Sequence, residues 1–408
     1  MRIAFVTYEF PPDTGKGGIG TYTSQVAKSL AEIGCDVHVF AGSGERRGTE
    51  KMEGYQIHRI QCENGNDFRH KVVNIFSGLH SSIAFDVIES AEINGNAWEI
   101  KKKHPSIPLV VRLHAPNYLV EMLKKRYVSF FAKFRFVAGA VRRLKFDLGY
   151  WQPYNKWIDA DYQFIGLADF ISAPSEAMKN WVVNHWGIPR NKITVIPNVF
   201  LPPSALLDIP VVEKPLYQRI LFFGRLNVLK GLVNATKAMK KILKAQPDWK
   251  FRVIGDDGAG PTFKMSMRNW MKQQLKEVIN QVEFIDGLVY EDLPLAIAEA
   301  EIVLLPSLFE SFSYTCAEAM AAGKAVVGSN NAGMADLIQN GISGILVNPN
   351  NYHDIYSAIK KLIVSNGLRH QIAINAREHI SVNFKAKLIA LEFKAFYEHI
   401  IENRIEKN

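Results

Sequence analysis

The sequence predicts an α/β protein of two domains, each built on a parallel β-sheet. Three observations predict this fold class. Short apolar runs alternate with helix-like segments, the alternation breaks at a proline-rich stretch and restarts, and conspicuous polar residues follow the ends of strands. Such alternation is typical of parallel sheets with helices on both faces. A length of 408 residues also suits two domains.

In the first half of the chain, short apolar runs predict the strands, and Gly34 ends the first helix. The predicted strands cover residues 3–8, 36–42, 85–90, 108–114, 170–175 and 193–198. The predicted helices cover residues 21–33 and 176–186, and a basic helix-like segment over 121–160 interrupts the alternation.

Five prolines between Pro197 and Pro215 predict a linker, and the pattern restarts after it. The predicted strands of the second half cover residues 220–225, 251–256, 282–287, 302–307 and 325–330, with helices near 231–245 and 264–278. Near the end of the chain, apolar residues recur at helical spacing and predict an amphipathic helix: Ile389, Phe393, Phe396 and Ile400.

Composition and charge exclude several classes of protein. No apolar run reaches 18 residues, so we expect no membrane-spanning helix. The N-terminal stretch MRIAFVTYEFPP predicts a first strand rather than a signal peptide. The three cysteines are far apart and form no C-x-x-C motif, which indicates neither a zinc site nor a disulfide scaffold. We therefore expect a protein of the cytoplasm.

Positive charge gathers in the segment 121–160. Nine cations and three carboxylates there account for six of the chain's nine net positive charges, and aromatic residues are interleaved with the cations. This composition suits an anionic membrane surface, at the inner face of the membrane. The alternative is a helix whose aromatics face the core and whose cations are solvated. No recognised nucleic-acid motif accompanies the charge, so we expect no nucleic-acid partner. The candidate residues for a membrane or acceptor surface are Lys124, Lys125, Arg126, Arg142 and Arg143.

The most informative motif is a pair of glutamates, Glu310 and Glu318, separated by seven residues after a predicted buried strand. Two carboxylates can accept hydrogen bonds from sugar and ribose hydroxyls, and a helix start supplies amides for phosphate oxygens. Upstream, Arg225 and Lys230 can balance a diphosphate, whereas cations near a helix start would otherwise oppose its dipole. The alternative is a glutamate that complements the helix dipole and another that is solvated.

Two further features follow predicted strands. The glycine loop GKGGIG, residues 15–20, lets the backbone approach a phosphate or sugar, although a tight turn explains it equally well. His114 ends a predicted strand, where a structural role is the alternative. Ligands of open parallel sheets bind at the carboxyl ends of the strands, so two such sheets facing each other would share one cleft.

The chain resembles the family 4 glycosyltransferases of GT-B architecture along nearly its whole length. The matching segments, in order, include FPPDTGKGGIG, FDVIES, VVRLHAP, ITVIPN, FFGRLNVLKG and ESFSYTCAEAMAAGKAVVGSNNAGMADLIQNGISGILV. The resemblance implies two Rossmann-like domains: residues 1–200 for the acceptor and 201–384 for the nucleotide sugar. It also implies a helix over 385–408 that returns to the N-terminal domain.

The resemblance assigns roles to single residues. It implies that Arg225 and Lys230 bind the diphosphate, that Glu318 binds the ribose hydroxyls and that Glu310 binds the donor sugar. Gly18 would approach the donor from the other domain, and His114 would lie beside the sugar. The expected catalytic residues are Glu310, His114, Arg225 and Lys230. The expected donor-binding residues are Gly17, Gly18, Arg225, Lys230, Asp256, Ile285, Glu310, Phe312, Ser313, Tyr314, Thr315 and Glu318.

Three positions depart from the family pattern. Ser313 replaces the usual second glycine of E-x-F-G, which narrows the backbone freedom there, and Tyr314 replaces a small aliphatic residue. The segment VEFIDG is one residue longer than usual, and because it normally touches the base, it leaves UDP and GDP both open.

The expected function is transfer of a sugar from a UDP- or GDP-sugar to a saccharide or lipid-linked acceptor, in the synthesis of a surface polysaccharide or glycolipid. Family membership implies retention of anomeric configuration without a metal or other cofactor. The alternatives within the fold are a sugar-nucleotide epimerase and a phosphorylase. Outside it, the alternatives are a two-lobed binding protein without activity and a nicotinamide dehydrogenase, for which the glycine loop lacks G-x-G-x-x-G.

Overall fold

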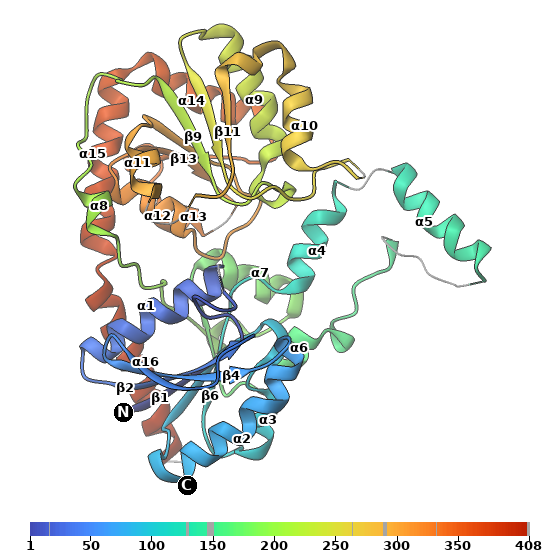
Figure 1. Ribbon diagram of the computed structural model, residues 1–408, viewed down its shortest axis with the longest axis vertical. Helices are drawn as coiled ribbons and strands as arrows, with labels where there is room; N and C mark the ends of the chain where they lie inside the picture. Colours follow the sequence, from blue (N-terminus) through green and yellow to red (C-terminus); the bar gives the residue numbers. More distant parts are fainter. Residues whose placement is uncertain are drawn as a thin grey trace. The chain divides into compact units, whose positions relative to one another are not determined.

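The computed structural model describes residues 1–15, 17–127, 130–144, 151–262, 264–288, 292–331 and 333–405. Within them the chain forms two compact units, each with its own sheet (Figure 1). The first unit comprises Met1–Asn117, Asn155–Leu201 and Phe384–Asn408. The second comprises Tyr118–Tyr154 and Pro202–Asn383. The basic segment is thus grouped with the second unit, whereas the sequence places it within residues 1–200.

The first unit contains an eight-stranded sheet in the order β3-β4-β2-β1-β5-β6-β7-β8. Its strands are β1 (Arg2–Thr7), β2 (Asp36–Ser43), β3 (Gly48–Met52), β4 (Tyr55–Gln61), β5 (Val87–Ala91), β6 (Leu109–Arg112), β7 (Phe170–Ala173) and β8 (Ile193–Val195). The sheet is parallel as predicted except at one edge, where β3 runs antiparallel to β4. Two strands, β3 and β4, have no counterpart in the sequence-based prediction.

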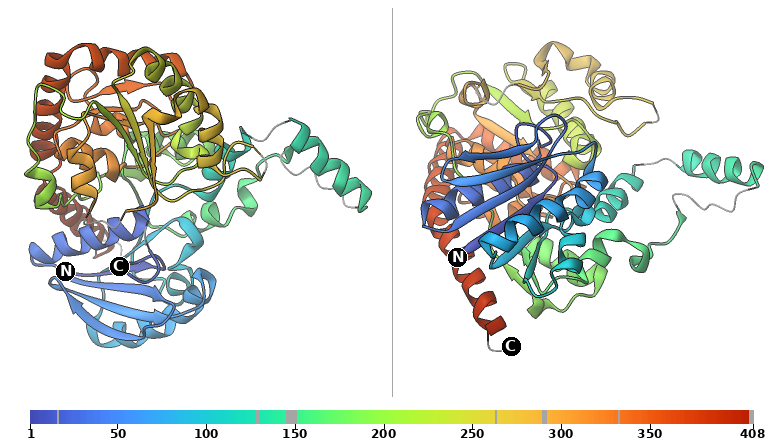
Figure 2. Two further views of the ribbon diagram at one scale, coloured as in Figure 1. Left: turned by 45° about the horizontal axis from the view of Figure 1, so that its top comes forward. Right: turned by 60° about the horizontal axis from the view of Figure 1, so that its bottom comes forward.

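Helices cover both faces of this sheet, as Figure 2 shows from two further directions. They are α1 (Gly18–Glu32), α2 (Gly65–Ile83), α3 (Trp98–Lys103), α6 (Ala160–Ile165), α7 (Glu176–Trp186) and α16 (Ala386–Ile405). The predicted limits of α7 agree with the structure because its caps are explicit. The Ser175 hydroxyl accepts a hydrogen bond from the Met178 amide, and Gly187 ends the helix in the left-handed conformation.

The second unit contains a six-stranded parallel sheet in the order β11-β10-β9-β12-β13-β14. Its strands are β9 (Arg219–Phe223), β10 (Lys250–Ile254), β11 (Val282–Ile285), β12 (Ile302–Leu305), β13 (Ala325–Ser329) and β14 (Ile345–Val347). Its helices are α8 (Ser204–Leu207), α9 (Leu232–Ala245), α10 (Met267–Gln274), α11 (Leu293–Ala298), α12 (Tyr314–Ala321), α13 (Met334–Leu337), α14 (Tyr352–Val364) and α15 (Asn366–Asn383). The basic segment adds α4 (Asn117–Lys125) and α5 (Phe130–Arg142).

The core of the second unit forms where α9 and α14 pack on the sheet. Apolar residues of α9, such as Leu232 and Met239, recur at helical spacing and are buried there. They lie in one core with residues of the central strands, such as Phe222 of β9 and Leu304 of β12. Because the sheet is covered on both faces, β12 is apolar throughout and β9 is apolar after Arg219, whereas Arg252 of β10 is paired with Glu283 and Glu299. Among the described residues, unpaired polar side chains that a ligand could reach, such as Arg225 and Asp256, follow the ends of the strands.

Candidate active site

In the second unit, four of the predicted donor-binding residues lie at the carboxyl ends of neighbouring strands. Arg225 follows β9, Asp256 follows β10, Ile285 ends β11 and Glu310 follows β12. Since the strand order is β11-β10-β9-β12 and the strands are parallel, these four positions lie side by side at the carboxyl end of the sheet. Arg225 and Asp256 are exposed there, whereas Glu310 is partly buried.

Glu310 lies in a polar cluster with Lys230 and Ser307. Its Oε1 atom forms an ion pair with Lys230 Nζ and accepts a hydrogen bond from the Ser307 hydroxyl at 3.0 Å. The side chains of Lys230 and Glu310 remain 28% and 19% exposed, so a ligand can still reach both. The cluster brings together two residues that the sequence predicts at the donor site, and Ser307 is an addition that the sequence did not indicate.

A glycine makes the close approach of these two loops possible. Gly231 has a φ of +70°, and a Cβ atom there would lie 1.8 Å from the carbonyl oxygen of Pro306. The Leu308 amide also donates to the carbonyl of Leu229 at 2.8 Å. Only glycine fits such a contact, so the loop that carries Lys230 is held against the loop that carries Glu310.

The second glutamate of the pair lies within α12. Glu318 is buried, and the helix begins at Tyr314, so Glu310 precedes its N-cap, Ser313, by three residues. Ser313 has φ −107° and ψ 98°, an extended conformation open to any residue, and its hydroxyl accepts a hydrogen bond from the Cys316 amide at 3.3 Å. Serine at this position therefore caps the helix rather than straining the loop. The first turn of α12 still directs its amides toward the loop.

In the first unit, the glycine loop leads into α1. Gly17 is the extended N-cap of the helix, and a Cβ atom on Gly18 would meet no heavy atom within 4 Å. By contrast, a Cβ atom on Gly15 would lie 2.8 Å from the Phe10 nitrogen. Packing thus requires glycine at position 15, whereas the space beside Gly18 is open to a ligand. Lys16 lies outside the described residues.

His114 is buried and lies two residues after the end of β6. Its backbone amide donates to both carboxylate oxygens of Glu92 at 2.9 Å. Burial, reinforced by the positive charge of Arg112, lowers the pKa of His114 to about 3, so the imidazole is neutral near pH 7. Burial raises the pKa of Glu92 to about 8 despite the His114 amide. His114 can therefore offer a hydrogen bond but not a positive charge.

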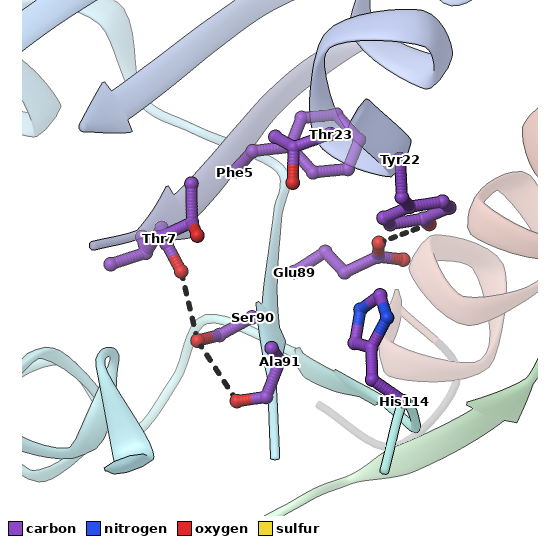
Figure 3. Close-up of a pocket in the computed structure, with 9 residues that line it drawn as sticks. Phe5, Thr7, Tyr22, Thr23, Glu89, Ser90, Ala91 and His114 are labelled. Carbon is purple, nitrogen blue, oxygen red and sulfur yellow. Dashed lines mark hydrogen bonds between the residues drawn. The ribbon is translucent and has the colours of Figure 1, made fainter. Parts of the chain in front are cut away.

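A second buried carboxyl, Glu89, lies beside His114 (Figure 3). Tyr22 and Tyr397 donate their hydroxyls to its two oxygens at 2.5 and 2.6 Å, and burial raises its pKa. A small pocket is lined by Phe5, Val6, Thr7, Tyr22, Thr23, Glu89, Ser90, Ala91 and His114. Neither Glu89 nor Glu92 was identified from the sequence, because an acidic residue at a strand end reads equally well as a solvated one.

Arg112 completes this cluster from β6. Its Nη2 atom donates to the Ile196 carbonyl and to Asn198 Oδ1, both at 2.7 Å. Within the described part of the chain, its Nε and Nη1 atoms have no hydrogen-bond partner. The guanidinium instead lies 4.9 and 5.1 Å from the ring centroids of Tyr22 and Phe393, at cation–π distance. Phe393 and Tyr397 both belong to α16, so the last helix contributes directly to the interior of the first unit.

The five candidate cations of the basic segment lie on or just after α4 and α5. Arg126, Arg142 and Arg143 are exposed, and Lys124 forms an ion pair with Glu121 at 3.0 Å. Lys145 and Phe146 of the same segment lie outside the described residues. Among the described residues, no helix is long and apolar enough to cross a membrane, and no group of three or more His, Cys, Asp or Glu residues could hold a metal ion.

Comparisons with known proteins identify relatives of both units. The family model for glycosyltransferase family 4 matches residues 16–200, and that for glycosyl transferases group 1 matches residues 211–379. An uncharacterised glycosyltransferase of Methanocaldococcus jannaschii is 24% identical, over 98% of this chain and 99% of its own length. A D-inositol 3-phosphate glycosyltransferase of Corynebacterium diphtheriae is 23% identical, over 97% of this chain and 94% of its own.

Solved structures share the fold at low identity. Sucrose-phosphate synthase from Thermosynechococcus elongatus superimposes with a TM-score of 0.73 at 18% identity, covering 98% of this chain and 99% of that one. HepE of Anabaena, solved in complex with UDP and glucose, superimposes with a TM-score of 0.66 at 18% identity, covering 98% and 100%. These likenesses show that the two-sheet architecture is shared over the whole chain.

Proposed function

Since the chain belongs to the family 4 type of glycosyltransferases with the GT-B fold, we propose that it transfers a sugar, with retention of configuration, from a UDP- or GDP-sugar to a saccharide or lipid-linked acceptor. The observation that carries the proposal is the cluster of Lys230, Glu310 and Ser307 at the carboxyl edge of the second sheet. A cation and a carboxylate held side by side, and still partly exposed, suit a ligand that presents phosphate next to hydroxyl groups.

The residues divide the work between leaving group and sugar. Arg225, Lys230 and the amides at the start of α12 supply positive potential where the diphosphate gains charge as it departs. Glu310 accepts hydrogen bonds from sugar hydroxyls, and Glu318 accepts them from the ribose. The glycines at positions 17 and 18 are assigned to the donor, and the neutral His114 is assigned to its sugar. Asp256, Ile285 and the loop residues Phe312 to Thr315 complete the proposed donor site.

We propose a front-face displacement without a metal or other cofactor. The bond between the anomeric carbon and the leaving phosphate oxygen breaks, and the acceptor oxygen forms a new bond on the same face. The acceptor proton passes to the leaving phosphate. Glu310 positions the sugar and does not attack it, so a Glu310→Gln enzyme should lose most of its turnover, and no glycosyl-enzyme adduct should be trapped.

We assign acceptor binding to the first unit. The acceptor itself is a polymer or lipid associated with a membrane. The cations Lys124, Lys125, Arg126, Arg142 and Arg143 suit an anionic surface, which supports work in the cytoplasm at the inner face of the membrane. The synthesis of a surface polysaccharide or glycolipid is a process that uses a nucleotide sugar at such a membrane surface.

A thermal-shift panel of UDP- and GDP-sugars and the free diphosphates tests the proposal. At 100 times its Kd, a ligand adds about 2.7 kcal/mol of stability. We expect one nucleotide family to raise the melting temperature of the wild type, and the shift to be lost in Glu318→Ala. If no nucleotide raises the melting temperature of the wild type, the second test is release of nucleoside diphosphate from the nucleotide sugar when membrane extract is added. If no diphosphate is released either, the proposed function is contradicted.

A further inference from the structure

Helix α5 carries an exposed apolar stripe. Phe130, Phe134 and Val141 are 71%, 58% and 61% exposed, and Leu144, just beyond the helix, is 97% exposed. Phe130, Phe134, Val137 and Val141 are spaced i, i+4, i+7 and i+11, which places them along one face of the helix, and Leu144 follows its end. Scattered exposed apolar residues are ordinary on a protein surface, but a continuous stripe of aromatic and aliphatic side chains marks an interaction site.

Cations flank the stripe on both sides. Successive residues of a helix are about 100° apart, so Lys133 lies on one side of Phe134, while Arg135 and Arg142 lie on the other. Arg143 points farther round, away from the stripe. From Met122 to Phe146 the sequence contains eight lysines and arginines and no aspartate or glutamate. The apolar face is thus bordered by charge of a single sign.

This combination decides which partner covers the stripe. A second copy of the chain would bring two such basic segments together, and their like charges would repel. An anionic bilayer accepts the apolar side chains among its acyl chains and pairs its head groups with the flanking cations. The length and amphipathic character of α5 suit a helix that lies in the membrane plane rather than one that crosses it.

We propose that α5 is an in-plane membrane anchor, whose stripe of Phe130, Phe134, Val137 and Val141, followed by the exposed Leu144, inserts at the head-group boundary of an anionic lipid leaflet. The inference rests on the proposed function in one respect: the leaflet is where a lipid-linked acceptor would be presented. It refines the membrane surface proposed from charge by naming the apolar face that enters the bilayer, with the cations as its flanks.

Co-sedimentation of the full chain with vesicles tests the anchor through a matched pair of variants. Phe134→Asp changes the stripe, whereas Phe136→Asp makes the same chemical change about 200° round the helix, away from the stripe. On vesicles that contain phosphatidylglycerol, we expect Phe134→Asp to weaken binding about tenfold or more, and Phe136→Asp to weaken it about threefold or less. Binding should also fall with salt and should be weak on vesicles of phosphatidylcholine alone.

Several outcomes would overturn the anchor. These are equal losses in the two variants, absence of wild-type binding to anionic vesicles, or a concentration-dependent dimer that Phe134→Asp dissociates. The nucleotide thermal shift, measured on the same samples, separates this inference from the proposed function. A retained shift without vesicle binding removes the anchor alone, whereas vesicle binding without any nucleotide shift or diphosphate release removes the transferase proposal alone.

Discussion

The Ser307 hydroxyl and the Lys230 ammonium group act on the same oxygen of Glu310. The ammonium group balances the negative charge of the carboxylate. The buried Ser307 hydroxyl, on the loop after β12, holds the carboxylate in its orientation. Because Glu310 is assigned to the donor sugar, Ser307 is a positioning residue. It should influence the sugar and leave the nucleotide unaffected.

We therefore predict a selective defect in Ser307→Ala. A hydrogen bond to a charged group contributes about 1.5–3 kcal/mol, so turnover of the nucleotide sugar should fall about tenfold or more. Binding of the free nucleoside diphosphate should be unchanged, because no sugar is present. Steady-state kinetics and diphosphate titration check both, with Ser311→Ala from the same loop as the control. Equal losses of diphosphate binding and turnover would show a collapsed loop instead.

For single residues, the sequence indicates which charged side chains belong to a site, but it does not indicate which side chains contact them. The sequence predicts Glu310, Lys230 and Arg225 at one site because two carboxylates and two cations suit a sugar nucleotide, and the structure pairs Lys230 with Glu310. Ser307 could not be predicted, because a serine after a strand is an ordinary turn residue. Glu89 and Arg112 could not either, since only the tertiary structure places their buried charges beside two tyrosines and a phenylalanine.

Among the elements, those with strong apolar patterns were predicted well. The strands β9, β10, β12 and β13 lie within one or two residues of their predicted ends, because buried parallel strands read as apolar runs. The strand β3 was missed because it is an exposed edge strand without alternation. Its neighbour β4 was missed because it buries the polar side chains of His58 and Arg59.

The last helix, α16, is the element whose role the structure specifies most closely. Its residues Phe393 and Tyr397 are fully buried, and the Tyr397 hydroxyl donates to Glu89 at 2.6 Å. The helix therefore closes the polar interior of the first unit, where an unpaired carboxyl oxygen would be costly. It is a structural part of that unit, not an appendage.

We predict that Tyr397→Phe destabilises the protein by about 1–3 kcal/mol, because it leaves one oxygen of buried Glu89 without its donor. Leu391→Ala, at a position of the same helix that is 43% exposed, should change stability by about 0.5 kcal/mol or less. Urea unfolding followed by fluorescence checks the pair. Similar small effects in both variants would mean that water replaces the tyrosine hydroxyl and that α16 does not close the cluster.

For the whole molecule, buried ionisable groups in the two units make stability depend on pH with opposite signs. Burial raises the pKa of Glu92, in the first unit, from 4.5 to about 8. The folded state therefore keeps a proton that the unfolded state releases between these values, and this contribution to stability is lost as pH rises toward 8. Burial lowers the pKa of Lys324, in the second unit, from 10.5 to about 8, so its contribution improves as pH rises from 8 to 10.5.

Between pH 6.5 and 8, Glu92 contributes to this fall in stability together with Glu89, whose pKa burial also raises, so only a substitution separates the two. The pKa of His114 is lowered from 6.5 to about 3, so its opposing contribution, a rise in stability with pH, tails off within about one pH unit above 6.5. Asp161 and Arg112 face the same cluster and influence Glu92 in opposite directions. Since glutamine has no proton to lose but can still accept the His114 amide, Glu92→Gln should flatten the fall in stability that this window shows in the wild type.

Calorimetric melts from pH 6 to 10 check this dependence in the wild type, Glu92→Gln and Lys324→Met. Two-domain proteins often unfold in more than one step, so each substitution should alter the transition of its own unit. Glu92→Gln should reduce the slope below pH 8, and Lys324→Met should reduce the slope above it. A wild-type slope retained below pH 8 in Glu92→Gln would mean that Glu92 is already ionised in the folded protein. His114 would then sit beside a negative charge, and the neutral imidazole assigned to the sugar would have to be reconsidered.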